Sequence, residues 1–277
     1  MYWQRSILKE NAKVSLRNKY WLSFAVSLVA SLLAGAIISV ITYAYSYSLY
    51  RSMFLNFTQL MQYSDYLPYY GYDSSAYDLV WTYMGQMILR MAAQLSGLSL
   101  LAILLRIFVG AAMRVGSSRY YVHKRFDDTN FSTLFSGFQN NWLNTVGALF
   151  VTDLFCSLWA LLFIIPGIVK RYQYYYVEFL LSDNPNLTGT RAREISRMLT
   201  NGEKGRIFIF DLSFFWWYLL VGITSWLTLG LSHTFLLPYV QSARAELYIF
   251  ARDRAINAGQ LNPAELGLAQ PQTPPVC

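Results

Sequence analysis

Several ionisable residues lie within long apolar stretches of the sequence, where charged side chains could do chemistry. Four of them are candidates for one cluster at membrane depth: Asp153, Glu178, Arg106 and Arg244. A charge at the centre of a bilayer costs at least about 2.5 kcal/mol, so such side chains usually face the interior of a helix bundle and pair there. We predict that Asp153 packs inward with Arg244 or Arg106 as its partner, and that Glu178 lines the same interior. The cluster would be either a structural ion pair or a pathway for a solute or proton.

Catalytic signatures are missing from the sequence. It has no phosphate-cradling Gly-Lys-Ser/Thr loop, no Gly-x-Ser-x-Gly and no His-Glu-x-x-His. His123 and His233 are isolated, and Cys156 and Cys277 are the two cysteines, too few for a framework of disulfides. Two cysteines and two histidines far apart do not favour a zinc site. We therefore expect no enzyme activity, no cofactor and no bound metal.

The element that must position the ionisable residues is a membrane-spanning helix. Residues 21–50 contain no charged side chain, and about twenty apolar residues are enough to cross a bilayer. The whole chain is 55% hydrophobic and 13% charged, whereas soluble domains carry about 25% charged residues. The net charge is +7, and in a membrane protein such an excess of basic residues usually lies in the cytoplasmic loops. We therefore expect no nucleic-acid partner.

The hydrophobic pattern predicts an all-α, polytopic transmembrane bundle of about six spans, with short amphipathic surface helices. The spans are predicted at residues 21–45, 87–113, 142–165, 168–182, 207–231 and 232–250. The fourth is interrupted by Lys170, Arg171 and Glu178, and a re-entrant helix is the alternative. Small residues recur at every fourth position of the first span and predict a stripe for close helix packing: Ser23, Ser27, Ser31, Gly35 and Ser39.

Residues 1–20 predict a basic amphipathic helix that lies on the inner membrane surface before the first span. Its basic residues step by four along one side: Arg5, Lys9, Lys13 and Arg17. Trp3, Ile7 and Val14 would form its apolar face. A signal peptide is the competing interpretation, but its apolar core is usually 7–15 residues long. The following apolar run is about twice that length, which favours a retained first span.

The distribution of charge predicts the topology. Residues 51–86 hold one basic residue, three acids and many tyrosines, so we place this connection outside; the basic stretches 114–141 and 183–206 are placed inside. Both termini would then be cytoplasmic. A second surface helix is predicted around residues 131–138, where apolar residues recur at helical spacing. The tail, residues 256–277, is rich in Pro, Gly and Gln and is predicted to be disordered.

The stretch from Pro166 to Trp217 resembles the central signature of a bacterial membrane family known as domain of unknown function 975. The shared features are a Pro-Gly-Ile turn at Pro166 to Ile168, a Tyr-rich segment at Tyr172 to Tyr176, an Asp-x-Pro at Asp183 to Pro185, a basic stretch at Ser196 to Lys204 and a Leu-Ser-Phe at Leu212 to Phe214. The likeness extends over most of residues 8–255, although Phe215-Trp216 and one extra residue in the basic stretch depart from the pattern. It implies a bacterial cytoplasmic membrane, about six helices and no established activity.

Three classes of function fit these features. The first is a non-enzymatic membrane component that binds lipid or a partner, the expected lipids being anionic headgroups at the inner face and the partner a second membrane protein. The second is a transporter or channel for a small solute that uses the polar intramembrane cluster. The third is a membrane enzyme that acts on lipid head groups. The sequence does not determine the oligomeric state.

Overall fold

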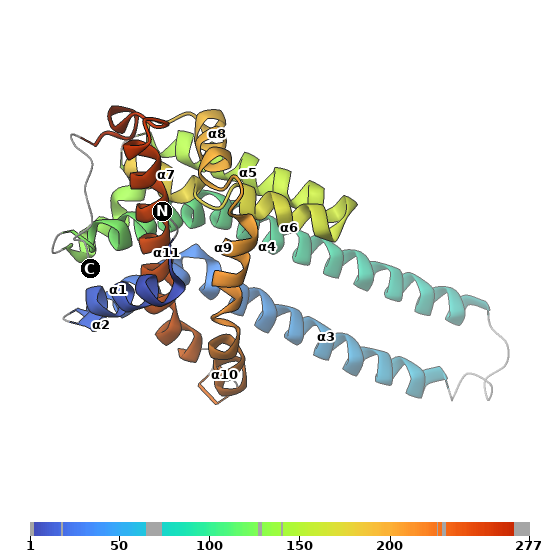
Figure 1. Ribbon diagram of the computed structural model, residues 1–277. Coiled ribbons are helices and arrows are strands. Elements are labelled where there is room, and N and C mark those ends of the chain that lie inside the picture. The colour runs from blue at the N-terminus through green and yellow to red at the C-terminus, as the bar shows by residue number, and fades with distance from the viewer. Residues whose placement is uncertain are drawn as a thin grey trace. The chain divides into compact units, whose positions relative to one another are not determined.

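The computed structural model describes residues 3–17, 19–64, 74–126, 129–139, 141–225, 227–228 and 231–268. All regular elements in these ranges are helices, as predicted (Figure 1). The chain divides into two compact units, Gly35–Arg106 and a larger unit made of Met1–Ala34 with Ile107–Cys277.

The smaller unit contains α3 (Ile37–Ser64) and the first part of α4 (Ser74–His123). Residues 51–64 and 74–86, predicted as an outer connection, are therefore mostly helical. The reason is that the first helix breakers in this region are Pro68 and Gly71, and both lie outside the described residues. Arg106 is exposed and is the last residue of this unit.

The first predicted span is not one continuous helix. In the larger unit, α2 (Tyr20–Ser31) leads into a π-helical turn at Leu32–Ala36. Gly35 in that turn has a φ of 123°, a value that helices do not contain. Glycine adopts it readily because it has no Cβ. The apolar run thus breaks at Gly35, and α3 begins two residues later.

Helix α1 (Arg5–Arg17) forms where the basic N-terminal helix is predicted, but it buries a different face. Leu8, Ala12 and Leu16 are its buried residues, and the helix packs on α11 (Leu231–Asn257). Of the predicted apolar face, Ile7 and Val14 are 44% and 63% exposed, whereas Trp3 is buried. At 100° per residue, the buried stripe runs beside the stripe of basic residues, so the cations lie at the edge of the α1–α11 contact.

Helices α5 (Trp142–Leu162) and α6 (Ile164–Gln173) form a tight hairpin and lie side by side (Figure 1). The break is the single extended residue Phe163, with φ −152° and ψ 131°. The predicted break, Pro166-Gly167, lies instead in the first turn of α6, where proline needs no helical N–H partner. A Cβ on Gly167 would lie 2.5 Å from the Cα of Ala160, so glycine is what allows the two helices to touch.

The remaining helices are α7 (Val177–Asp183), α8 (Gly189–Leu199), α9 (Lys204–Leu212), α10 (Phe215–Ser225) and α11. Three helical stretches of the described residues are long and apolar enough to cross a membrane: Leu100–His123, Trp142–Leu162 and Lys204–Ser225. Tyr20–Gly35 is a shorter apolar helix. These stretches indicate a membrane protein, and the predicted count of about six spans is not confirmed. Residues 174–176 interrupt the helix in the predicted span 168–182.

Two short 3₁₀ helices complete the larger unit. Phe131–Phe138 forms η3 where a surface helix is predicted, and Leu134 is its fully buried side chain. Pro263–Leu266 forms η4 inside the tail predicted to be disordered, with Leu261 and Leu266 buried. The tail is therefore folded as far as Leu268, because its two leucines pack on the hydrophobic core; the rest of it lies outside the described residues.

Candidate functional site

The prediction that Asp153 pairs with Arg244 or Arg106 is wrong. Asp153 forms an ion pair with Arg114 of α4, with 2.7 Å between the side-chain nitrogen and oxygen. The Asp153 and Arg114 side chains are 58% and 42% exposed, so the pair is not buried in the interior. Arg244 pairs instead with Asp211 of α9 at 3.2 Å. Position along the predicted spans gave the depth of these groups but not the direction in which each helix face points.

Glu178 and Arg244 do come together at one cavity of about 300 Å³. Four parts of the larger unit surround it: α2, the end of α4, the α6–α7 segment and α11. Its lining residues are Ser27, Ala30, Ser31, Ala34, Met113, Arg114, Ser117, Arg171, Glu178, Leu237, Gln241 and Arg244. Arg114 and Gln241 were not among the predicted cluster, since neither is distinguished by spacing or motif. This feature is called the polar cavity below.

The small-residue stripe of α2 contacts α4 through hydrogen bonds. The Ser27 hydroxyl lies 2.6 Å from that of Tyr121, and the Ser23 hydroxyl lies 3.2 Å from that of Tyr120. Ser31 donates to the Leu28 carbonyl of its own helix. Gly35 belongs to the helix break, and the side chain of Ser39 lies outside the described residues. The stripe thus joins α2 to α4 in its first half and borders the polar cavity.

A groove of about 830 Å³ lies between α1 and the α10–α11 pair. The α1 side supplies three charged residues, Glu10, Lys13 and Arg17, while the other side is largely apolar. The apolar wall consists of Trp217, Leu220, Val221, Phe235, Leu236 and Tyr239. Trp217 and Leu220 are 53% and 55% exposed. This feature, called the amphipathic groove below, therefore presents a net charge of 2 − 1 = +1 beside accessible apolar surface.

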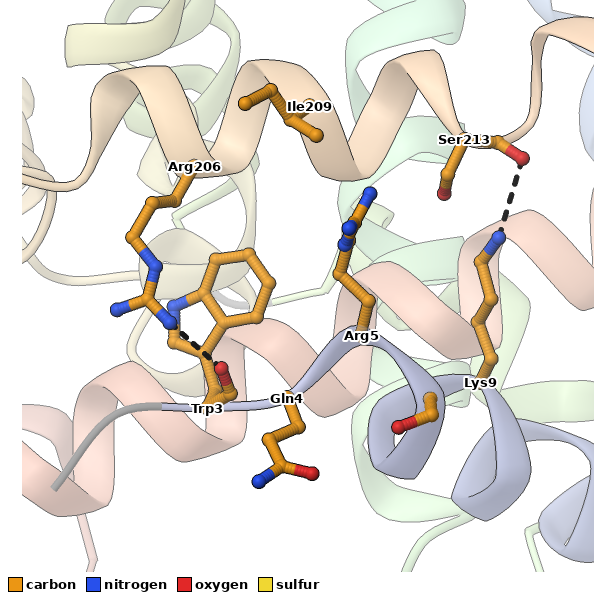
Figure 2. A pocket seen from close by; sticks show the side chains of 8 residues that line it. Trp3, Gln4, Arg5, Lys9, Arg206, Ile209 and Ser213 are labelled. Carbon is orange, nitrogen blue, oxygen red and sulfur yellow. Dashed lines mark hydrogen bonds between the residues drawn. The ribbon is translucent and has the colours of Figure 1, made fainter.

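A basic pocket of about 650 Å³ lies where the start of α1 faces α9 (Figure 2). Arg5 and Lys9 from α1 and Arg206 from α9 point into the space between the two helices. Arg206 donates to the Trp3 carbonyl at 2.8 Å, and Lys9 donates to the Ser213 carbonyl at 3.2 Å. No acidic residue is among the described residues that line it. Burial, together with the charges of Arg5 and Lys13, lowers the pKa of Lys9.

The four basic residues of α1 divide evenly between these two features. Arg5 and Lys9 line the basic pocket, and Lys13 and Arg17 line the amphipathic groove. The spacing of four, visible in the sequence, is what keeps all of them beside the buried stripe of α1. The sequence alone located the cations but gave no sign that α9, α10 and α11 would supply the opposite walls.

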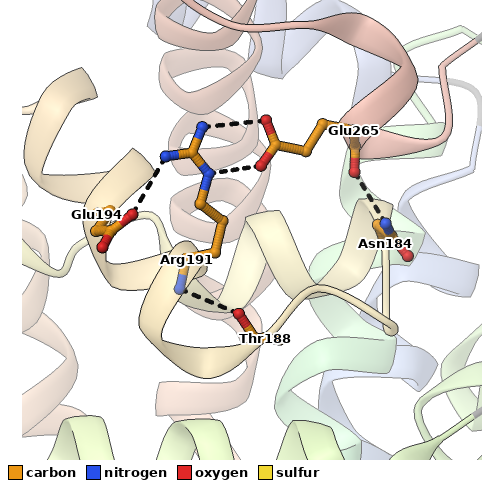
Figure 3. A network of polar contacts seen from close by, with 5 residues as sticks. All are labelled: Asn184, Thr188, Arg191, Glu194 and Glu265. Atoms are coloured by element: carbon orange, nitrogen blue, oxygen red, sulfur yellow. Dashed lines mark hydrogen bonds and ion pairs between the residues drawn. The ribbon is translucent and has the colours of Figure 1, made fainter.

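A separate polar network fixes the tail to α8 (Figure 3). Arg191 donates to both carboxylate oxygens of Glu265, at 2.6 and 3.2 Å, and to Glu194 at 3.2 Å. Asn184 donates to the Glu265 carbonyl at 2.9 Å. The hydrogen bonds from Arg191 lower the pKa of Glu265. These polar groups form hydrogen bonds with one another, so we interpret the network as a structural link between the tail and α8.

Comparison with known proteins supports the family resemblance. A family model described as "Protein of unknown function (DUF975)" matches residues 161–255. No curated protein and no solved structure matches the chain. The matched range runs from the end of α5 through most of α11, and it includes Arg171, Glu178, Gln241 and Arg244 of the polar cavity. The basic helix α1 lies outside it.

Proposed function

We propose that this relative of a family without assigned function is a non-enzymatic, multi-pass protein of the bacterial cytoplasmic membrane that binds anionic lipid at the inner face. The observation that supports the proposal is the amphipathic groove, which puts Lys13 and Arg17 beside an apolar wall. A phospholipid has the matching composition, with a negative headgroup next to acyl chains. The groove would hold the headgroup at α1 and one chain against Trp217 and Leu220.

The position of the apolar wall strengthens this proposal. Trp217 and Leu220 belong to Lys204–Ser225, one of the three stretches apolar enough to cross a membrane. An acyl chain on this wall would therefore lie alongside a span, where chains are found in a bilayer. Basic residues near an anionic surface each contribute about 1 kcal/mol, and the adjoining basic pocket adds Arg5, Lys9 and Arg206.

Neutralising the groove should weaken the binding of anionic lipid. For Lys13→Gln with Arg17→Gln, we expect phosphatidylglycerol to bind about 30-fold more weakly, since two contributions of about 1 kcal/mol are lost. The measurement is lipid retention by native mass spectrometry of the full-length protein, taken from nanodiscs that contain equal phosphatidylglycerol and phosphatidylcholine. Higher salt should reduce the wild-type preference for phosphatidylglycerol.

The matched control is Lys204→Gln, which removes a cation of α9 that lines neither the groove nor the basic pocket. It should leave the preference for phosphatidylglycerol unchanged. The proposal fails if the double variant keeps the wild-type preference, or if the wild type retains both lipids equally.

The proposed topology places residues 51–64 outside and the C-terminal segment inside. In a background with Cys156→Ser and Cys277→Ser, Ser52→Cys and Gln260→Cys provide exposed positions in the two regions. A membrane-impermeant maleimide added to spheroplasts should label Ser52→Cys directly, and Gln260→Cys only after permeabilisation. Labelling of both from the same side would rule the topology out. Ser117, on the inner stretch, is unsuitable because its side chain is buried.

A second candidate, a transporter or channel for a small solute, is favoured by the polar cavity. Glu178 and Arg244, two of the four ionisable residues predicted to lie at membrane depth, both line it. Flux of candidate solutes into proteoliposomes distinguishes the two functions: lipid binding alone gives no flux above that of empty vesicles.

A further inference from the structure

The polar cavity contains two acceptor groups that accept no hydrogen bond from the described residues. Glu178 forms no hydrogen bond or ion pair with any residue that the structure describes, although it lines the cavity. The side-chain oxygen of Gln241 is buried and has no hydrogen-bond partner either. Glu178 is half-buried, and the positive charges of Arg114, Arg244 and Arg171 act on it without a hydrogen bond. A buried acceptor that is left without a donor is destabilising. Both groups would be satisfied by a ligand that carries several N–H donors, such as an ammonium.

The same cavity contains three guanidinium groups. Arg114 and Arg244 also pair with Asp153 and Asp211, while Arg171 forms no ion pair with the described part of the chain. Asp153 and Asp211 offset two of these three positive charges and Glu178 offsets the third, so the surroundings of the cavity are close to neutral, 3 − 3 = 0. A simple cation would leave Arg171 without an anionic partner, and a simple anion would leave Glu178 and Gln241 without a hydrogen-bond donor. The lining therefore matches a molecule with opposite charges at its two ends.

We propose that the polar cavity binds a small zwitterion, with its ammonium on Glu178 and Gln241 and its oxyanion on Arg171 and Arg244. A volume of about 300 Å³ is at the small end of the range for ligand sites and suits a molecule of this class. Phosphoethanolamine has both groups, and it occurs free or as the headgroup of phosphatidylethanolamine. This site shares no residue with the amphipathic groove and does not depend on the lipid proposed there.

The test is calorimetric titration of the full-length protein in phosphatidylcholine nanodiscs, because the choline headgroup has no N–H donor. The probes are O-phosphoethanolamine, inorganic phosphate and ethanolamine. We expect O-phosphoethanolamine to bind at least about tenfold more tightly than either single-charge probe. Glu178→Gln should abolish that advantage while phosphate binds as well as before or better. Arg171→Gln should weaken both phosphate and O-phosphoethanolamine.

Glu194→Gln is the matched control, since Glu194 is an exposed carboxylate of α8 outside the cavity. This substitution should leave the affinities for all three probes unchanged. If Glu178→Gln does not fold, Gln241→Leu provides the same comparison by removing the second acceptor. Equal binding of phosphate and O-phosphoethanolamine to the wild type would overturn the proposal, as would an unchanged preference in the folded Glu178→Gln or Gln241→Leu variant.

The source of the zwitterion is decided by repeating the titration in nanodiscs that contain phosphatidylethanolamine. Loss of O-phosphoethanolamine binding there identifies the lipid headgroup as the occupant, and retained binding identifies a free solute. Both results support the site. If O-phosphoethanolamine does not bind in phosphatidylcholine and phosphatidylethanolamine is not retained selectively from mixed nanodiscs, the proposal is wrong.

Discussion

Replacing Gly116 with alanine is expected to destabilise the protein strongly, by about 3 kcal/mol or more. A Cβ on Gly116 of α4 would lie 1.8 Å from the carbonyl oxygen of Leu134 in η3. On the other side of the same contact, a Cβ on Gly137 of η3 would lie 1.9 Å from the carbonyl oxygen of Ala112 in α4. Both obstacles are backbone atoms, which cannot rotate away, so the segments must separate. Overpacking of this kind typically costs 1–3 kcal/mol, and backbone clashes fall at the upper end.

The measurement is thermal unfolding of the purified protein in detergent, together with its yield in membranes. Gly137→Ala should behave like Gly116→Ala, because the two glycines belong to one contact. Gly147→Ala in α5 is the matched control: a Cβ there meets no atom within 4 Å, and alanine favours helix by about 1 kcal/mol. An unfolding temperature for Gly116→Ala equal to that of Gly147→Ala would contradict the close approach of α4 and η3.

The second large effect is expected at Asp183, the first residue of the Asp-x-Pro signature. Its carboxylate accepts from the Tyr248 hydroxyl at 2.6 Å and from Arg252 at 3.1 Å. The Asp183 and Arg252 side chains are 3% and 1% exposed. Asp183→Leu would leave the Arg252 charge buried with Asp253 alone, and burial already raises the pKa of Asp253. Breaking a buried pair from one side costs about 3–5 kcal/mol.

Two comparisons make this prediction specific. Asp183→Leu combined with Arg252→Met and Asp253→Leu should recover much of the loss, because all three charges of the buried group are then removed together. Glu265→Gln, which weakens the exposed Arg191–Glu265 ion pair, should cost no more than about 1 kcal/mol. Unfolding in detergent measures all three variants. If Asp183→Leu is no less stable than Glu265→Gln, the buried pair does not hold α7 against α11.

Local sequence determined the helical class and the position of several elements. Apolar runs of sufficient length and few charges indicated membrane helices, and α5 (Trp142–Leu162) begins at the predicted residue and ends three residues before the predicted end. The spacing of four placed the α1 cations on one side of that helix, since helical periodicity depends only on the chain itself. Pro166 and Gly167 marked the α5–α6 hairpin, although its break lies a few residues earlier, at Phe163.

Tertiary structure alone decided which faces meet. Depth along a span is proportional to residue number, but the rotation of each helix about its axis is set by packing against several neighbours at once. Asp153 therefore pairs with Arg114 rather than with Arg244 or Arg106, and α1 buries Leu8, Ala12 and Leu16 in a contact with α11 that the sequence did not indicate. The tail was misjudged for the same reason, because Leu261 and Leu266 are buried only through contacts with distant parts of the chain.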